Sequence, residues 1–275
     1  MALVLRLKVD DTLPIEAESL RPDHLVAMKS DEVRALPVYH GNRARTVGDC
    51  FACEGDAADG VLILEGDCGR VKHIGQNMAF GAITVRGAAG MHLGAEMTGG
   101  TIEVEGRAGD WVGAEMRGGT IRIRGDAGHL VGGCYRGGTA GMKGGAIIVE
   151  GDAGNEVGCN MRRGLIAIAG SVGDFAGFNM IAGSIFVGGR FGVRCGAGMR
   201  RGTVVALDGT DGRPDLLPTF RFDCHFHPQF MGIYIRQLRR WGFPVEAGAA
   251  TASYARYSGD LVGLGKGEIL IRDSD

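Results

Sequence analysis

The amino-acid sequence predicts an all-β protein built as a parallel β-helix, a single-stranded solenoid of about seven coils with short helical additions at its ends. A glycine-rich motif, G-x-x-G-x-x-x-G-x-x-M-x-x-G-x-I-x-I, recurs between Gly66 and Leu207 with a period of about 19 residues. Each copy ends in a segment where apolar and polar residues alternate, which is the period of a half-buried strand. A unit this short cannot form a βαβ element, which needs roughly 30 residues, but it can form one coil of a stack.

The copies begin at glycines of one phase and differ in length at two places. The first copy, residues 66–86, is longer than the regular one because two extra residues lie between Gly69 and Gly75. The fourth copy, residues 125–150, is longer because of an insertion around residues 138–144. The start glycines are Gly66, Gly87, Gly106, Gly125, Gly151, Gly170 and Gly189.

Three apolar columns are expected to fill the interior of the stack, since equivalent positions of successive coils lie above one another. The first column is Ile102, Ile121, Ile147, Ile166, Ile185 and Val204. The second is Val104, Ile123, Val149, Ile168 and Val187. The third is Met78, Met97, Met116, Met161, Met180 and Met199, with Tyr135 taking the methionine position in the fourth copy. Core filling explains this methionine column better than a metal site does.

The sequence divides into three regions. Residues 1–50 are expected to form an N-terminal cap, with a strand over 3–9 and one or two short helices within 16–36. Residues 51–207 are expected to form the glycine-rich β-helix, and residues 208–275 a C-terminal extension. In this extension we expect a loop over 208–228, an amphipathic helix over about 229–241, and a final strand within 259–271 that pairs with the end of the sheet. The apolar face of the helix is predicted to be Phe230, Ile233, Tyr234, Leu238 and Trp241.

Composition excludes several classes of protein. The 30 Lys and Arg residues nearly balance the 32 Asp and Glu residues, which gives no general attraction to nucleic acid or to a membrane surface. No apolar run reaches the roughly 18 residues that a spanning helix needs. The N-terminus lacks the layout of a signal peptide, and the seven cysteines do not form the pattern of a secreted disulfide framework. The protein is therefore expected to be cytoplasmic.

Two cysteine-containing groups have ligand-like spacing. Cys50 and Cys53 form a C-x-x-C, which is a zinc or redox candidate, but no second pair accompanies it. Cys224, His225 and His227 form the densest cluster, and packing or interface roles remain the favoured interpretation of both groups. His73, His92 and His129 fall in corner segments but not in one phase, which argues against a catalytic role. No hydrolase, zinc-protease or Walker motif occurs, so we expect neither catalytic nor metal-binding residues in this chain.

Arginines after the methionine phase form a possible contact surface. They are Arg117, Arg136, Arg162 and Arg200, with second arginines at Arg163 and Arg201. Like charges on neighbouring coils need acidic neighbours or an anionic partner. Glu96 and Glu115 lie just before the arginine positions and can neutralise part of the row. A solvated face with local ion pairs, an acidic partner surface and a polyanionic ligand all remain open; the predicted contact residues are Arg162, Arg163, Arg200 and Arg201.

The repeat resembles the glycine-rich β-helix of the C-terminal domain of glutamate synthase large subunits. It is more similar to the C subunit of formylmethanofuran dehydrogenase, including that of the bacterial formyltransferase/hydrolase complex. Residues 151–164 are typical of this subunit. Residues 36–42 and 47–51 resemble the segment that leads into the repeat in this family. The resemblance implies that the β-helix is right-handed and that the chain acts in one-carbon metabolism.

What the family does is also implied by this resemblance. The archaeal complex reduces CO2 to a formyl group on methanofuran. The bacterial complex passes a formyl group from tetrahydromethanopterin to a methanofuran analogue and hydrolyses it to formate. The catalysis belongs to other subunits, a formyltransferase and a metal-dependent, amidohydrolase-like subunit.

The resulting hypothesis is a non-catalytic scaffold subunit of a hetero-oligomer that bridges these two catalytic subunits. The chain itself is expected to bind no cofactor, while its complex uses a methanofuran-type carrier and tetrahydromethanopterin. The arginine row would bind an acidic surface of a partner or the polyglutamyl tail of a carrier. Two alternatives stay open. One is a glutamate-synthase-like module, and the other is an independent β-helical enzyme such as a polysaccharide lyase or an acyltransferase.

Overall fold

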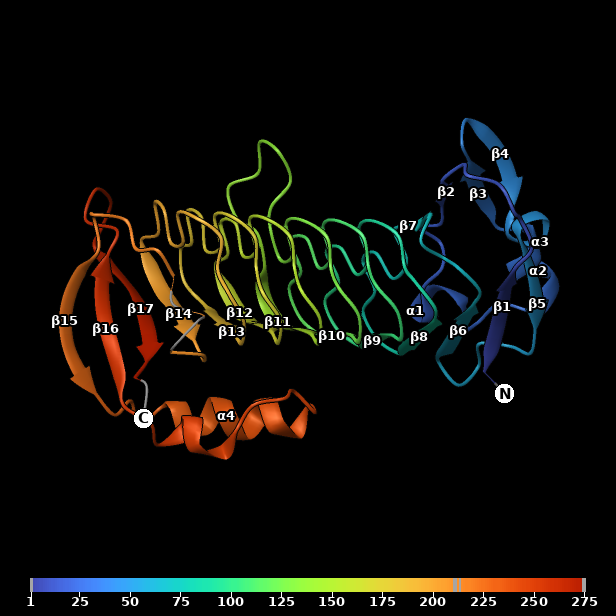
Figure 1. Ribbon diagram of the computed structural model, residues 1–275. Helices are drawn as coiled ribbons and strands as arrows, with labels where there is room; N and C mark the ends of the chain where they lie inside the picture. Colours follow the sequence, from blue (N-terminus) through green and yellow to red (C-terminus); the bar gives the residue numbers. More distant parts are fainter. Residues whose placement is uncertain (1, 210–211, 213, 274–275) are drawn as a thin grey trace.

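The protein is mostly β, with one long mixed sheet and few helices (Figure 1). The computed structural model describes residues 2–209, 212 and 214–273. The 13-stranded sheet has the order β15-β16-β17-β14-β13-β12-β11-β10-β9-β8-β6-β1-β5. Its strands are β1 (Leu3–Leu7), β5 (Phe51–Glu54), β6 (Val61–Glu65), β8 (Ala82–Arg86), β9 (Thr101–Val104), β10 (Thr120–Ile123), β11 (Lys143–Val149), β12 (Arg163–Ile168), β13 (Ser184–Val187), β14 (Arg201–Ala206), β15 (Arg221–Phe226), β16 (Tyr254–Gly259) and β17 (Lys266–Arg272).

Successive repeats lie side by side, and each adds one parallel strand to this sheet. From β6 to β14 every neighbouring pair is parallel, with Ile121 opposite both Ile102 and Ile147. The repeats also meet on another side of the chain, through a column of single parallel bridges: Cys68, Ala89, Ala108, Ala127, Ala153, Val172 and Phe191. The two predicted columns of Ile and Val are confirmed, since every member is at most 1% exposed.

The methionine column is confirmed except in the fourth repeat, where the prediction for Tyr135 is wrong. Met142 occupies the buried position there, and Tyr135 lies partly exposed. A Cβ atom added at Gly164 would lie 2.8 Å from the methyl carbon of Met142, just as one added at Gly183 would lie 2.9 Å from that of Met161. The inserted residues leave the stack before this position, so the repeat resumes only at Met142.

Glycines of the motif allow this close stacking. Gly145 has φ +87°, a backbone conformation that residues other than glycine rarely adopt. A Cβ atom there would lie 2.6 Å from the carbonyl oxygen of Gly119 and 2.7 Å from the methyl carbon of Met116. The glycine content of the sequence is therefore required by contact between neighbouring repeats.

The N-terminal end of the sheet is covered by a second, smaller sheet and three short helices. β1 pairs in parallel with β6 and antiparallel with β5. The small sheet has the order β4-β3-β2-β7, and β7 forms where the first repeat carries its two extra residues. Its strands are β2 (Ile15–Glu16), β3 (Pro37–His40), β4 (Arg43–Thr46) and β7 (Val71–Lys72); the helices are α1 (Pro22–Leu25), α2 (Ser30–Ala35) and α3 (Val47–Cys50).

The other end of the sheet is extended by β17, β16 and β15. β17 continues the parallel series, with Ile269 opposite Val204, and β16 and β15 then add antiparallel strands. The final strand is therefore confirmed. The loop predicted over 208–228 is wrong in its last part, because β15 forms there. β15 was missed because its alternation of apolar and polar residues is short and because its pairing partner, β16, comes much later in the chain.

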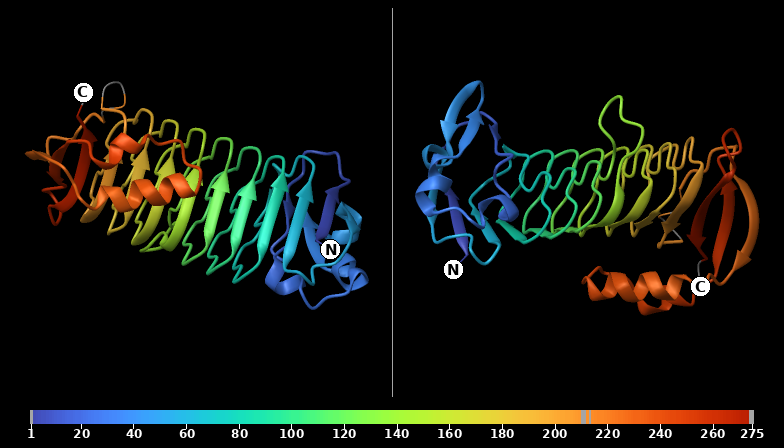
Figure 2. Two further views of the ribbon diagram at one scale, coloured as in Figure 1. Left: turned by 90° about the horizontal axis from the view of Figure 1, so that it is seen from below. Right: turned by 180° about the vertical axis from the view of Figure 1, so that it is seen from behind.

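Helix α4 (Met231–Arg240) lies across the outer face of the sheet, over its later strands (Figure 2). Its buried residues are Met231, Ile235 and Leu238, which pack with Leu165, Phe186 and Val205 among others. The predicted apolar face is wrong in part, because Ile233 is 72% exposed. A short 3-10 helix, η1 (Ala247–Ala250), follows α4. Among the described residues no helix has the length and apolar character needed to cross a membrane.

Candidate functional site

The arginine row lies where the strands of the later repeats begin. Arg162 and Arg163 lie at the start of β12, and Arg200 and Arg201 at the start of β14; all four are exposed. Arg136 does not belong to the row, because it lies in the inserted segment of the fourth repeat. Lys143 takes its place there and lies opposite Arg163 in the β11–β12 pairing. Because of the insertion, aligning the repeats by sequence put Arg136 at the position that Lys143 holds in the structure.

The four predicted contact arginines of the row form two separate pairs. The repeat between them carries Ile181 and Ala182 at the equivalent positions, so about two strand spacings, or roughly 10 Å, separate the pairs. Arg201 lies opposite Lys266 of β17, which adds a third cation at that end. Glu115 contacts Lys143, the cation at the row position of the fourth repeat, at 3.6 Å, and not one of the four predicted contact arginines. Within the described residues none of the four arginine side chains has a hydrogen-bonded or ionic partner.

The polar residues after the corner glycines form a ladder that joins neighbouring repeats. Asp110 Oδ1 accepts the backbone amide of His129 at 2.7 Å. His129 Nδ1 accepts that of Asn155 at 2.8 Å, and Asn155 Oδ1 accepts that of Asp174 at 2.9 Å. Asp174 Oδ1 in turn accepts the amide of Val193 at 2.9 Å. These side chains satisfy backbone donors, so His129 acts as a structural hydrogen-bond acceptor.

A stack of rings lies beside this ladder. The rings of His73 and His92 are stacked with centroids 4.6 Å apart, and the rings of His92 and Trp111 are 5.3 Å apart. Nδ1 of His92 lies 3.0 Å from the hydroxyl of Tyr135. Burial lowers the pKa of His92 to about 4 and raises the pKa of Tyr135 to about 12. Both groups are therefore neutral near pH 7, which suits packing better than proton transfer.

The residues of the two cysteine-containing groups, Cys50 with Cys53 and Cys224 with His225 and His227, do not converge on a common site within either group. Burial raises the pKa of both Cys50 and Cys53, so the thiolate form is disfavoured. His225 Nδ1 contacts Asp273 at 2.9 Å, whereas His227 Nδ1 lies 3.1 Å from the carbonyl oxygen of Thr251. Over residues 2–209, 212 and 214–273, no group of three or more His, Cys, Asp and Glu side chains is placed to hold a metal ion.

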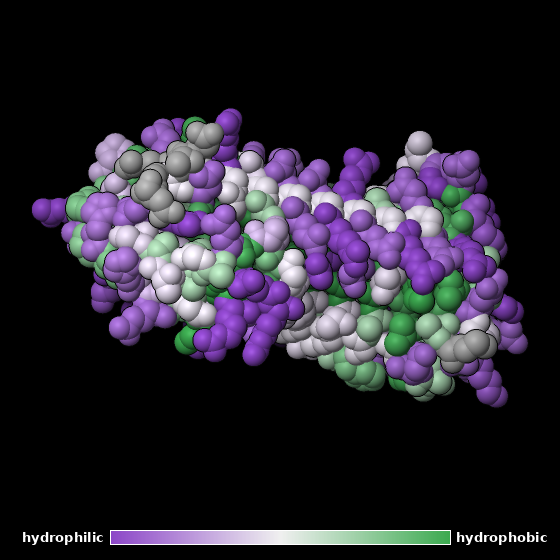
Figure 3. Space-filling view, turned by 60° about the horizontal axis from the view of Figure 1, so that its bottom comes forward, coloured by the Kyte–Doolittle hydropathy of each residue, from purple (hydrophilic) through white to green (hydrophobic). Residues whose placement is uncertain are grey.

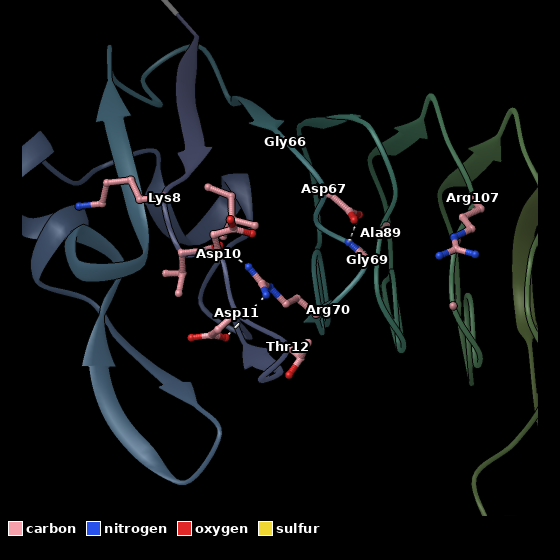
Figure 4. A pocket seen from close by; sticks show the side chains of 14 residues that line it. Lys8, Asp10, Asp11, Thr12, Gly66, Asp67, Gly69, Arg70, Ala89 and Arg107 are labelled. Carbon is pink, nitrogen blue, oxygen red and sulfur yellow. Dashed lines mark hydrogen bonds and ion pairs between the residues drawn. The ribbon is translucent and has the colours of Figure 1, made fainter.

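A depression of about 710 Å³ lies between the N-terminal cap and the first repeats. Arg70 points from the first repeat toward Asp11, with Nη1 and Oδ1 3.6 Å apart (Figure 4). Arg70 also donates to the carbonyl oxygen of Val9, and Asp11 contacts His40 at 2.9 Å. These bonds hold the cap against the first repeat. Arg107 lies on the rim, exposed. The sequence gives no sign of this depression, because its lining residues come from separate segments of the chain.

Comparisons with known proteins support the identification of the glycine-rich repeat. The family model described as the GXGXG motif matches residues 63–215, which is more than half of the chain. The crystal structure of the formyltransferase/hydrolase complex (FhcABCD) from Methylorubrum extorquens in complex with methylofuran contains a chain that is 37% identical, with a TM-score of 0.90. That match covers 98% of this chain and 100% of the other.

Curated relatives match over a shorter stretch. The C subunit of the molybdenum-containing formylmethanofuran dehydrogenase 1 of Methanothermobacter thermautotrophicus is 45% identical over 92 residues, which is 33% of this chain and 23% of that protein. The C subunit of the tungsten-containing formylmethanofuran dehydrogenase 2 of the same organism is 40% identical over 93 residues, or 32% of this chain and 34% of that protein. The matched stretch thus spans about a quarter to a third of these relatives. This chain belongs to the GXGXG motif family, and the C subunit of formylmethanofuran dehydrogenase and a chain of the formyltransferase/hydrolase complex are its homologues.

Proposed function

We propose that this chain is a non-catalytic structural subunit of a one-carbon complex that acts on a methanofuran-type carrier. The observation that carries the proposal is the match, over nearly the whole length of both chains, to a chain of the FhcABCD complex. The local chemistry supports it. Asp110, His129, Asn155 and Asp174 each cap a backbone amide of the next repeat, and burial keeps His92 neutral.

The proposed architecture behind this role is a right-handed parallel β-helix over residues 51–207, with a cap over 1–50 and an extension over 208–275. Two contacts per repeat support it, namely the parallel strands and the separate column of bridges from Cys68 to Phe191. A stack of this kind is long and rigid, since each unit binds only its neighbours. It is therefore suited to holding other subunits at fixed separation.

The proposed partners are a formyltransferase subunit and a metal-dependent, amidohydrolase-like subunit, which this chain would bridge. The complex would use tetrahydromethanopterin and a methanofuran-type carrier, and we expect this chain itself to bind no cofactor. Arg162, Arg163, Arg200 and Arg201 are proposed to contact either an acidic surface of a partner or a polyglutamyl tail. Their exposure without carboxylate partners among the described residues supports this assignment.

The experiment replaces these four arginines by serine in the co-expressed complex. Because charge-assisted bonds of arginine to carboxylates are strong, we expect subunit recovery or carrier retention to fall by about tenfold or more. The matched control replaces Arg43, Arg45, Arg136 and Arg221, which are exposed elsewhere on the chain. It makes the same change in charge and is expected to leave assembly and carrier content unchanged.

Equal recovery of subunits and carrier from both variants would overturn the role of the arginine row. The two other functions make different predictions for the unaltered protein. A glutamate-synthase-like module would co-purify with amidotransferase and synthase chains. An independent β-helical enzyme would show activity as the purified chain alone.

A further inference from the structure

A basic groove lies between α4 and the segment around η1. Its volume is about 860 Å³, and His227, Pro228 and Thr251 line one part of it. α4 contributes residues spaced by three and four positions, which places them on one side of the helix: Gly232, Ile235, Arg236, Arg239 and Arg240. Hydrophilic and hydrophobic side chains both reach the surface on the face seen in Figure 3.

The three arginines of this groove lack the acidic neighbours that several other arginines of the chain have. α4 contains three arginines and no acidic residue. Glu246, which precedes η1, contacts Arg272 at 3.2 Å and is therefore engaged beside the groove. Over the part of the chain that the structure describes, no ion pair involves Arg236, Arg239 or Arg240.

Several arginines elsewhere on the sheet are paired with glutamate. Arg122 donates to Glu150 at 2.7 Å, and Arg256 contacts Glu268 at 3.0 Å. Positions three and four residues apart on a helix are neighbours, and like charges at these positions repel one another. The three guanidinium groups of α4 thus raise the free energy of the isolated chain, and an anion in the groove relieves this repulsion.

The rest of the lining restricts the kind of anion. Ile235 is buried, and Ala247 and Ala250 of η1 add apolar surface, so the floor of the groove favours an apolar group. His227 adds a polar edge to the groove, and its Nδ1 lies 3.1 Å from the carbonyl oxygen of Thr251. A ligand with several carboxylates and interspersed apolar side chains matches both features.

We propose that this groove is a docking site for an acidic segment of another protein chain, with carboxylates on the arginines and an apolar side chain over Ile235. The site is formed by residues other than the arginine row at the strand starts, and its occupation does not require that row. Arginine forms paired hydrogen bonds with carboxylates, so charge and geometry both contribute to recognition.

Fluorescence anisotropy of the full chain with a labelled peptide of three Asp-Asp-Leu repeats tests the proposal. The triple variant R236Q/R239Q/R240Q is expected to bind at least about tenfold more weakly. The control R43Q/R45Q/R136Q makes the same charge change at exposed arginines and is expected to lose less than about twofold. The variant R236K/R239K/R240K should fall between the two, because lysine keeps the charge but not the paired geometry. Thermal melting confirms that each variant is folded, and single variants replace any triple variant that is not.

Three results would overturn the proposal. One is equal weakening in the α4 variant and in the control, which would mean that only net charge matters. Another is binding of a Lys-Lys-Leu repeat peptide as tightly as the acidic one. The last is displacement of the acidic peptide by inorganic phosphate at the peptide's own concentration, which would assign the groove to small anions instead.

Discussion

The Nδ1 atom of His129 accepts the backbone amide hydrogen of Asn155 at 2.8 Å, although the two residues belong to different repeats. Asn155 occupies the same position of the next repeat and repeats the bond to Asp174. Aspartate, histidine and asparagine thus perform one task at one position of the motif. The bond explains why a histidine in a corner segment is structural here.

Replacing His129 by alanine removes this acceptor and leaves the amide of Asn155 without its protein partner. We expect a loss of about 1 kcal/mol in the free energy of unfolding. His129→Asn restores the acceptor that the next repeat uses and should recover most of the loss. Urea unfolding of the three proteins measures both values. Equal stability of the alanine and asparagine variants would show that the bond contributes nothing.

Gly145→Ala places a methyl group against the preceding repeat. The residue has φ +87°, and the new carbon would lie 2.6 Å from the carbonyl oxygen of Gly119. We expect destabilisation of about 2 kcal/mol or more, from strain and from displaced backbone. Gly232→Ala is the control, because a Cβ atom there meets nothing within 4 Å and alanine favours the helix. Thermal melting should show opposite shifts; parallel shifts would contradict the contact argument.

Met142→Ala tests the assignment of the methionine position in the fourth repeat. The side chain is fully buried, so we expect a loss of about 2–5 kcal/mol from lost contacts and a cavity. Tyr135→Phe removes only the hydroxyl that bonds to His92 and should cost about 1 kcal/mol. Denaturant titration compares the two. A larger loss for Tyr135→Phe would return the core position to Tyr135.

His92 makes stability depend on pH. Its pKa falls from 6.5 to about 4 in the folded protein because of burial. Below pH 6.5 the unfolded chain takes up a proton that the folded chain refuses, so stability is complete above pH 6.5 and declines as the pH falls to about 4. We expect this contribution to be on the order of 2 kcal/mol, because water screens the partly exposed ring.

The measurement for His92 is the difference in unfolding free energy between the protein and His92→Gln across this range. The difference should change by the expected amount between pH 6.5 and 4 and stay constant above about pH 7. His227→Gln, at an exposed ring, serves as the control. A constant difference for His92→Gln would contradict the effect of burial on its pKa.

The repeat unit was predictable because each position is repeated in neighbouring copies. Ile121 is buried between Ile102 and Ile147, as the spacing of the motif predicts. The insertion defeated the same logic, since counting residues from Gly125 places Tyr135 where Met142 lies. Counting back from Ile147 gives the correct position, because the strand keeps its distance from the methionine.

The terminal segments and the ladder depended on contacts that spacing alone does not define. The orientation of α4 follows from Phe186 and Val205 on the sheet, so Ile233 faces outward although it is apolar. The ladder left a signal in the sequence, because Asp110, His129, Asn155 and Asp174 all follow the second glycine of their repeats. All four side chains accept a hydrogen bond. Because they are of different residue types, this shared role is hard to recognise in the sequence.

Purification of the native protein, followed by identification of its partners by mass, tests the structural-subunit proposal most directly. We expect the chain to co-purify in fixed proportion with a formyltransferase and an amidohydrolase-like chain. We also expect the separated chain to have no formyl transfer or hydrolysis activity. Recovery of the chain alone with activity of its own, or with amidotransferase chains, would contradict the account.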